Sequence, residues 1–191
     1  MTVFVKNLSY FRSERKIFED INFSLKSGEI LVISGTNGSG KTTLLRAISG
    51  LNSSVLGEIN INKKDIFLLG HNIGIKPNIT VGEDLEFWSN FYNKEHDSET
   101  LKNLSIESKI HLLCRYLSQG QKQKLALTRL FCAKKRIWLL DEPFSFLDEE
   151  TCNFLLKKIK NHCENDGITI VVSHLNLIQN PNQSIVLGDL F

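Results

Sequence analysis

The sequence is short of several features that mark whole classes of protein. It has only four cysteines, Cys114, Cys132, Cys152 and Cys163, and none of them forms a Cys-x-x-Cys pair. We therefore expect them to be buried or half-buried reduced thiols and not metal ligands or disulfides. No apolar run approaches the roughly 18–20 residues that span a bilayer. Residues 1–10 lack the basic and apolar regions of a secretory signal. Any membrane role is therefore expected to depend on a partner.

Strong charge of one sign is also missing. The formal net charge is +2, the pI is about 8.3, and basic residues are scattered apart from short clusters such as Lys134–Arg136, which argues against a nucleic-acid-binding face. Only three prolines occur in 191 residues, and no internal repeat is visible. With 41% hydrophobic and 23% charged residues the composition is that of a globular protein, and a single domain over residues 1–191 is predicted.

Short apolar runs alternate with helical patterns along the chain. Residues 2–5 and 17–25 are predicted strands, the second half-buried, and together they suggest an antiparallel N-terminal β region. Residues 29–34, 137–140 and 168–172 are predicted to be buried strands. Because they alternate with helices, the sequence predicts an α/β fold whose core is a mostly parallel sheet covered on both faces.

A small helical lobe is predicted over about residues 79–116. Thr80 and Glu83 have the spacing of a capping box, which opens a run rich in aromatic residues over 84–92. These aromatic side chains are predicted to pack against the body of the protein. A second capping box, Ser118 to Gln121, is predicted to open a helix over residues 122–133.

Residues 35–42 match the pattern G-x-x-x-x-G-K-[ST] between a predicted buried strand and a predicted helix over 41–49. Glycines let backbone N–H groups surround phosphate oxygens, and the helix N-terminus attracts the same anion. Lys41 is expected to reach the β and γ phosphates of ATP, the Thr42 hydroxyl to bind Mg²⁺, and Thr43 to touch the α phosphate. The predicted nucleotide-binding set is Gly35, Thr36, Asn37, Gly38, Ser39, Gly40, Lys41, Thr42 and Thr43.

Two adjacent carboxylates, Asp141 and Glu142, follow the predicted strand over 137–140. In an open α/β sheet the carboxyl ends of the strands form the edge where ligands bind. Asp141 is expected to hold the Mg²⁺ shell, and Glu142 to polarise the attacking water. On its own the pair would more readily be a solvated strand end; the phosphate loop elsewhere in the chain favours catalysis.

The stretch Leu117–Gln121 resembles the signature sequence of ABC-type ATPases, with Gln119 in place of the usual glycine. Ser145–Asp148 resembles the D-loop of that family, and His174 its switch histidine, so the resemblance covers nearly the whole chain. It implies a P-loop NTPase of the ABC type in which Lys41, Glu142 and His174 are catalytic. It also implies that Ser118, Gly120 and Gln121 contact the ATP of a second copy of the chain. Many members of the family have an aromatic residue that stacks on adenine. Tyr10 and Phe11 are the candidates for this role, although the family's position aligns with Arg12.

From the length of 191 residues, an ABC protein with long coiled-coil insertions or with two cassettes is not expected. His71 aligns with the family's glutamine that senses Mg²⁺ through water, and its surroundings resemble the ATP-binding subunits of cytochrome c maturation systems. That resemblance implies a translocase motor at the cytoplasmic face of the inner membrane, held there by separate membrane-spanning subunits. Heme is the traditional cargo of such complexes, but no heme-binding motif such as Cys-x-x-Cys-His is present.

Two other classes of function remain open. One is a soluble ABC-type ATPase of cofactor assembly, such as iron–sulfur assembly, or the motor of another small ABC exporter. The other is an interaction module that binds ATP without hydrolysing it. The second class is disfavoured because Lys41, Asp141, Glu142 and His174 are all present.

Overall fold

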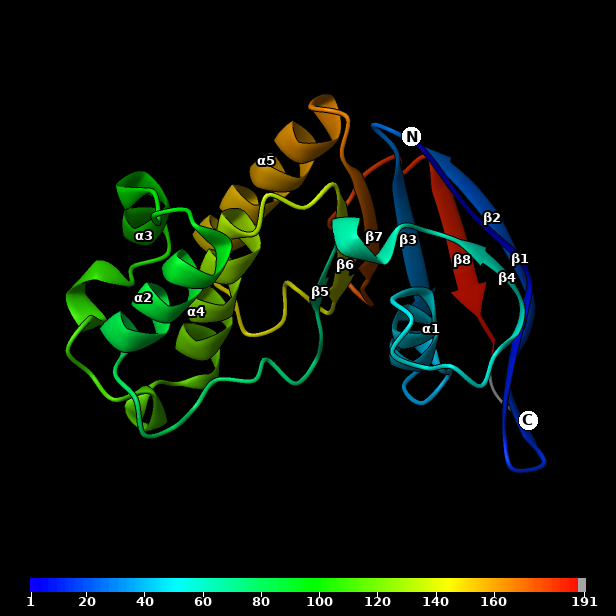
Figure 1. The fold of residues 1–191 in the computed structure, drawn as a ribbon, viewed down its shortest axis with the longest axis horizontal. Helices are drawn as coiled ribbons and strands as arrows, with labels where there is room; N and C mark the ends of the chain where they lie inside the picture. Colours follow the sequence, from blue (N-terminus) through cyan, green and yellow to red (C-terminus); the bar gives the residue numbers. More distant parts are fainter. Residues whose placement is uncertain (189–191) are drawn as a thin grey trace. The chain divides into compact units, whose positions relative to one another are not determined.

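The computed structural model describes residues 1–188, which form two compact units (Figure 1). Unit 1 contains Met1–His71, Lys135–Pro143 and the chain from Lys158 onward. Unit 2 contains Asn72–Lys134 and Phe144–Lys157. The last three residues of the predicted domain over 1–191 lie outside the described part. Unit 2 includes the segment predicted as a helical lobe. The chain crosses between the units after His71, Lys134, Pro143 and Lys157.

A five-stranded parallel sheet forms the centre of unit 1. Its strands lie in the order β5 (Ile66–Leu69), β6 (Ile137–Asp141), β7 (Ile168–Val172), β3 (Ile30–Gly35) and β8 (Gln183–Leu187). Every neighbouring pair is parallel, as the buried runs predict. Strand β8 was not predicted. Because parallel strands end at one common edge, this order brings the ends of β3, β6 and β7 together.

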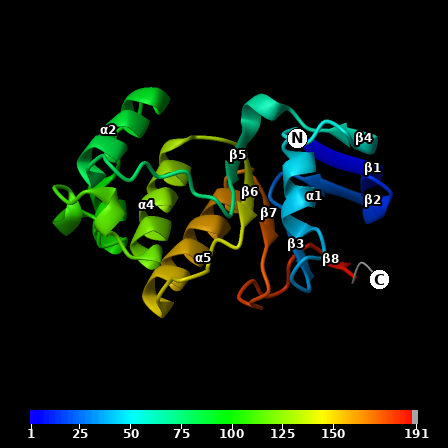
Figure 2. The same cartoon turned by 90° about the horizontal axis from the view of Figure 1, so that it is seen from below.

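Both faces of the parallel sheet are covered, which explains why β6 and β7 are buried at every residue. Helix α1 (Lys41–Ile48) packs against β3, β6 and β7 and lies next to β3 in both views (Figures 1 and 2). On the other face, the indole of Trp138 stacks on the imidazole of His162, with centroids 3.8 Å apart and planes at 5°. His162 belongs to the end of α5 (Glu149–Glu164).

The N-terminal strands form an antiparallel sheet in the order β2 (Arg15–Lys26), β1 (Thr2–Arg12) and β4 (Leu56–Asn60). The antiparallel region is confirmed, but both predicted strands were too short and β4 was missed. Register shifts between Val5 and Leu8 and between Leu8 and Tyr10 interrupt the alternation of buried and exposed residues. The period-2 pattern that reveals a strand in the sequence is therefore lost after Val5, although β1 continues.

Unit 2 is mainly helical. It contains α2 (Val81–Tyr92), α3 (Ser98–Asn103), α4 (Gln119–Cys132) and the first part of α5, with short 3₁₀ turns at Glu107–Lys109 and Cys114–Tyr116. A further 3₁₀ turn, Lys63–Asp65, belongs to unit 1. Both predicted capping boxes are present. They begin α2 and α4 a few residues earlier than predicted. Helices α2 and α4 lie side by side (Figures 1 and 2).

The prediction that the aromatic side chains of α2 pack inward is wrong for two of them. Phe87 is 54% exposed and Phe91 66% exposed. Their rings stack on each other at 6.3 Å, because residues four apart lie on the same face of a helix. Trp88 and Tyr92 are half-buried and stack in the same way. Helix α2 thus has an aromatic surface that its own unit covers only in part.

The expected burial of the thiols is confirmed. Cys114, Cys132 and Cys163 are buried and Cys152 is half-buried. Burial raises the pKa of all four thiols, so the uncharged form is favoured. Among residues 1–188, no helix is long and apolar enough to cross a membrane.

The stack of His162 on Trp138 makes stability depend on pH. Burial lowers the pKa of His162 below its usual 6.5, so the unfolded chain binds a proton more readily than the folded one. We expect the free energy of unfolding to fall as the pH drops below 6.5. The variant His162→Phe keeps the stack without the titrating group and should lose less stability over that range. Thermal unfolding of both proteins at several pH values checks this, and equal losses would contradict it.

Candidate functional site

The phosphate loop joins β3 to α1 within unit 1. Gly40 has φ 94°, a left-handed conformation that disfavours a side chain, and an added Cβ would lie 2.8 Å from Cγ2 of Ile17. Lys41 is only 8% exposed, and its ammonium donates to the carbonyls of Gly35 and Thr36, each at 2.8 Å. These carbonyls fold the lysine back over the loop, in the place where a phosphate would meet it.

The ends of β6 and of the phosphate loop meet through one hydrogen bond. The Thr42 hydroxyl donates to Oδ2 of Asp141 at 2.8 Å, although the two residues are 99 positions apart. Oδ1 of Asp141 is buried and has no hydrogen-bond partner among the described residues. Burial raises the pKa of Asp141, while the bond from Thr42 and one from the His71 backbone lower it.

A buried carboxylate oxygen with a free acceptor site, beside a hydroxyl, suits a hard divalent cation with oxygen ligands. In the described part of the chain no cluster of three or more His, Cys, Asp or Glu side chains is arranged to hold a metal. A cation at Thr42 and Asp141 therefore requires further oxygen ligands, such as phosphate oxygens and water. The residues fit a metal ion that arrives with a nucleotide.

Glu142 and His174 form a close pair beside this site. Nδ1 of His174 lies 2.9 Å from Oε2 of Glu142; the glutamate side chain is 16% exposed and the imidazole 57% exposed. Glu142 has φ 50°, which is uncommon for a residue with a side chain, and its N–H donates to the carbonyl of Val172 at 2.9 Å. Strained backbone of this kind gathers at functional sites. The two predicted catalytic side chains are thus brought together.

His71 directly follows Gly70 at the end of β5, and its side chain is exposed. Its backbone lies close enough to Asp141 to form the hydrogen bond that lowers the pKa of that carboxylate. Both the backbone and the charge of the imidazole of His71 act to lower the pKa of Asp141, and the contact of the imidazole with a metal ion through water stays a prediction.

The signature residues belong to unit 2 and begin α4. The Ser118 hydroxyl accepts from the N–H of Gln121 at 3.2 Å, and the Gln121 side chain accepts from the N–H of Ser118 at 2.9 Å. Gly120 lies against the D-loop, where an added Cβ would come within 2.5 Å of the Phe146 carbonyl oxygen. Phe146 itself is 71% exposed. The signature and the D-loop are thus packed together with no space for a side chain.

An ion pair also joins α4 to the D-loop. The Lys124 ammonium lies 2.5 Å from Oδ2 of Asp148. The other oxygen of Asp148 accepts from the N–H and hydroxyl of Thr151, so Asp148 caps the start of α5. These bonds hold the pKa of Asp148 well below its usual range. The D-loop is therefore fixed to both helices of unit 2 that flank it.

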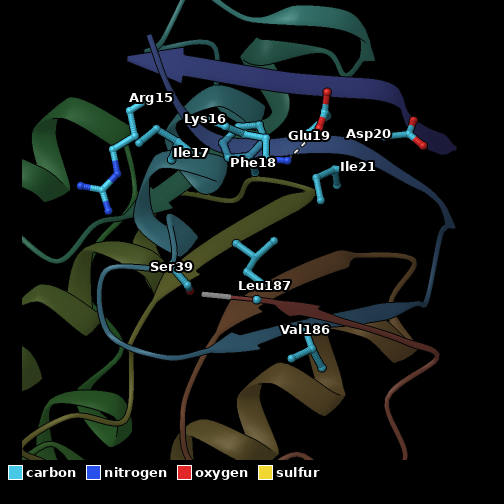
Figure 3. Close-up of a pocket in the computed structure, with 11 residues that line it drawn as sticks. Arg15, Lys16, Ile17, Phe18, Glu19, Asp20, Ile21, Ser39, Val186 and Leu187 are labelled. Carbon is cyan, nitrogen blue, oxygen red and sulfur yellow. Dashed lines mark hydrogen bonds and ion pairs between the residues drawn. The ribbon is translucent and has the colours of Figure 1, made fainter. Parts of the chain in front are cut away.

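A hollow of about 610 Å³ lies beside the phosphate loop in unit 1. Figure 3 shows Ile17 and Ile21 of β2 on one side, Leu187 of β8 opposite them, and Ser39 of the phosphate loop beside Leu187. Sequence reasoning missed this hollow because β8 was not predicted. Its only signal was the apolar run Ile185–Leu187. Of the residues proposed for adenine stacking, Tyr10 packs against Phe18 at 6.0 Å and is half-buried, whereas Phe11 is 39% exposed.

A glycine-rich loop at a helix N-terminus, with an Asp-Glu pair at the end of a neighbouring parallel strand, defines a P-loop nucleotide-binding protein. The family model described as ABC transporter matches residues 18–145, and the chain belongs to the ABC transporter family. The match runs from β2 through the D-loop serine. It covers the phosphate loop, the signature and the Asp-Glu pair.

Relatives of similar length extend the match to almost the whole chain. The cytochrome c biogenesis ATP-binding export protein CcmA of Haemophilus ducreyi is 35% identical, over 96% of this chain and 94% of its own. The protein of the same name from Vibrio cholerae is 35% identical, over 97% of this chain and 98% of its own.

Solved structures share the fold. A protein from Pyrococcus furiosus described as an ABC transporter ATP-binding protein has a TM-score of 0.82 and 25% identity, with 98% of each chain covered. An ATP-binding cassette solved as a dimer in a post-hydrolysis state with ADP and Pi has a TM-score of 0.81 and 25% identity, covering 97% of this chain and 94% of its own. The chain is an ABC-type ATPase with the fold that its sequence predicts.

The contact of Gly120 with the D-loop predicts an unusual response to alanine. In a helix, Gly→Ala normally stabilises by roughly 0.5–1 kcal/mol. Gly120→Ala should instead destabilise by about 1–3 kcal/mol, because its Cβ would press on the Phe146 carbonyl. Urea unfolding measures the change. Gly70→Ala is the control, since an added Cβ there meets nothing within 4 Å; equal effects at both sites would contradict the prediction.

Proposed function

We propose that this chain is the ATP-hydrolysing motor of a membrane export complex, of the heme-transporting type, that serves the biogenesis of c-type cytochromes. The assignment of ATP hydrolysis rests on the 2.9 Å contact between His174 and Glu142, which lie in the same unit as Lys41 and Asp141. A module that only binds ATP would have no need of a carboxylate held by an imidazole. The assignment to cytochrome biogenesis draws on relatives that carry that name at 35% identity.

Glu142 serves as the general base that polarises the attacking water, and His174 holds its carboxylate in place. The side chain of Glu142 is 16% exposed, so water can reach it while the surroundings remain partly dry. Lys41 leaves the carbonyls of Gly35 and Thr36 to neutralise charge on the β and γ phosphates. The N–H groups of residues 35–43 hold the phosphate oxygens.

Mg²⁺ is the cation that best suits Thr42 and Asp141, since it is bound through few protein oxygens together with phosphates and water. When bound, it would neutralise charge on the phosphates during transfer to water. The hydrogen bond that already joins Thr42 to Asp141 holds both oxygens ready for it. His71 would reach the ion through a water molecule.

Ser118, Gly120 and Gln121 are proposed to contact the ATP bound by a second copy of the chain. The capped N-terminus of α4 offers free N–H groups and the positive end of the helix dipole. An ABC-type ATPase of similar fold is known as a dimer. Separate membrane-spanning subunits would hold this dimer at the cytoplasmic face of the inner membrane.

The variant Glu142→Gln tests the assignment of the base. It should bind Mg·ATP, lose at least roughly a hundredfold in hydrolysis rate, and accumulate as a dimer in the presence of ATP, because the general base is lost while the binding groups remain. Sizing in ATP and phosphate release measure these effects. His71→Ala is the comparison: it should still bind ATP and should not trap the dimer. Normal hydrolysis by Glu142→Gln would show that another group is the base.

Deletion of the gene tests the biological role. We expect c-type cytochromes to lose covalently attached heme, which heme-stained gels detect. The wild-type gene should restore the heme and Lys41→Ala should not, because the lysine is needed for phosphate binding. Normal c-type cytochromes in the deletion strain would rule out the biogenesis role and leave the ATPase assignment unaffected.

A further inference from the structure

The hollow beside the phosphate loop in unit 1 has the size of a small-molecule site, at about 610 Å³. Because Ser39 of that loop lines it, a nucleotide whose phosphates are held by the loop would have its base in the hollow. Ile17, Ile21 and Leu187 give it aliphatic walls (Figure 3). Phe18 is the one aromatic residue among the described residues that line it, and it is only 5% exposed. A base in this hollow would therefore meet aliphatic groups and no exposed ring.

The aromatic residues just before this strand do not supply a ring either. Tyr10 is half-buried and packs against Phe18, with ring centroids 6.0 Å apart. Neither Tyr10 nor Phe11 lines the hollow. Stacking on an aromatic ring strengthens the binding of any base, because every base has a flat π face. A stacking partner of this kind would have to come from outside the hollow.

An exposed ring stands directly before the signature residues in unit 2. Tyr116 is 67% exposed and lies two positions before Ser118, which is proposed to contact the ATP of a second copy. Two residues of chain span at most about 7 Å. A nucleotide whose phosphates lie at Ser118 therefore has its sugar and base close to Tyr116.

The backbone between these two residues turns their side chains to the same side. Leu117 has φ −72° and ψ 138°, which is extended backbone, and it is only 4% exposed. In extended backbone successive side chains point to opposite sides. Tyr116 and Ser118 thus lie on the side opposite to the buried Leu117. The ring faces the same ligand as the serine that caps α4.

The turn that presents the ring is fixed to the body of unit 2. The N–H of Cys114, a buried residue, donates to the carbonyl of Ile79 at 2.8 Å, and the N–H of Tyr116 donates to the carbonyl of Leu113 at 3.0 Å. The guanidinium carbon of Arg115 lies 5.0 Å from the centre of the Tyr116 ring, over one face. The other face is left for a second flat partner. A ring already held in place loses little conformational freedom when a base stacks on it.

We propose that Tyr116 stacks on the adenine base of the ATP bound by a second copy of the chain. The base then lies between this ring and the aliphatic wall at Ile17 of the copy that binds the phosphates. The inference rests on the proposed function, in which Ser118 of one copy contacts the ATP of the other. It adds a binding residue for the base to the signature residues, which act on the phosphates. Recognition of the base thus depends on formation of the dimer.

The variant Tyr116→Leu tests this, because it keeps an apolar side chain but removes the flat ring. Combined with Glu142→Gln, it should raise the ATP concentration that gives half-maximal dimer by roughly tenfold to a hundredfold. Tyr116→Trp in the same protein should restore the original value. Sedimentation velocity over a range of ATP concentrations measures the dimer. Phe91→Leu is the matched control: Phe91 is 66% exposed in the same unit, and its loss should leave the ATP dependence unchanged.

Photolabelling shows from which copy the ring comes. ATP with an azide on the adenine ring, bound to the Glu142→Gln protein and irradiated, labels residues that touch the base. In the dimer, tryptic peptides 17–26 and 116–122 should both be labelled. Dilution to the monomer should abolish the label on residues 116–122 and keep the label on residues 17–26.

Two results would overturn the inference. One is an unchanged ATP dependence of the dimer in Tyr116→Leu, which is the result expected if Tyr116 serves only to contact a membrane-spanning subunit. The other is a label on residues 116–122 that persists in the monomer. If the Glu142→Gln protein with Tyr116 intact forms no dimer with ATP, the proposed dimeric ATPase itself is contradicted, and the inference with it.

Discussion

The hydrogen bond between Thr42 and Asp141 is the contact on which the site depends. It joins the start of α1 to the end of β6, and it exists because β3 and β6 run parallel in one sheet and end at the same edge. Asp141, the last residue of the buried strand β6, and Ser173–His174, which follow the buried strand β7, lie at that edge. A carboxylate in this position is partly desolvated, which raises its pKa and leaves one oxygen without a partner. Both effects make a bound cation favourable.

Unit 2 depends on another kind of contact. Its helices α2 and α4 meet through one buried ion pair and a set of rings, and α4 holds both the D-loop and the loop after His71. Close backbone approach at Gly120 leaves no freedom between signature and D-loop. Polar bonds with fixed geometry thus define positions within unit 2, where apolar packing alone would permit several.

The nucleotide-binding core could be predicted from the sequence because its signals are local. The run Ile168–Val172 matches β7 in full, and the capping boxes at Thr80 and Ser118 form as their spacing indicates. Elements without a local signal were missed. Strand β8 begins with the polar residues Gln183 and Ser184 and so lacks the mostly apolar run of β6 and β7, and β1 has irregularities that interrupt its alternation. The exposed rings of Phe87 and Phe91 could not be distinguished from core residues, since hydrophobic pattern does not reveal which helical face a neighbour covers.

By itself the sequence determined the class of chemistry. A phosphate loop between strand and helix, an Asp-Glu pair after a buried strand, and a capped signature helix each follow from residue types at fixed spacing. Tertiary structure alone decided the pairings: His174 with Glu142, Lys124 with Asp148, and Arg129 with both Asp84 and Ile73. Lys124 and Asp148 are 24 positions apart in the sequence, and Arg129 and Ile73 are 56 positions apart. Pairs at such separations produce no pattern in a short stretch of sequence. They meet because chain segments far apart fold against one another, and the geometry of that meeting is not encoded in any short stretch.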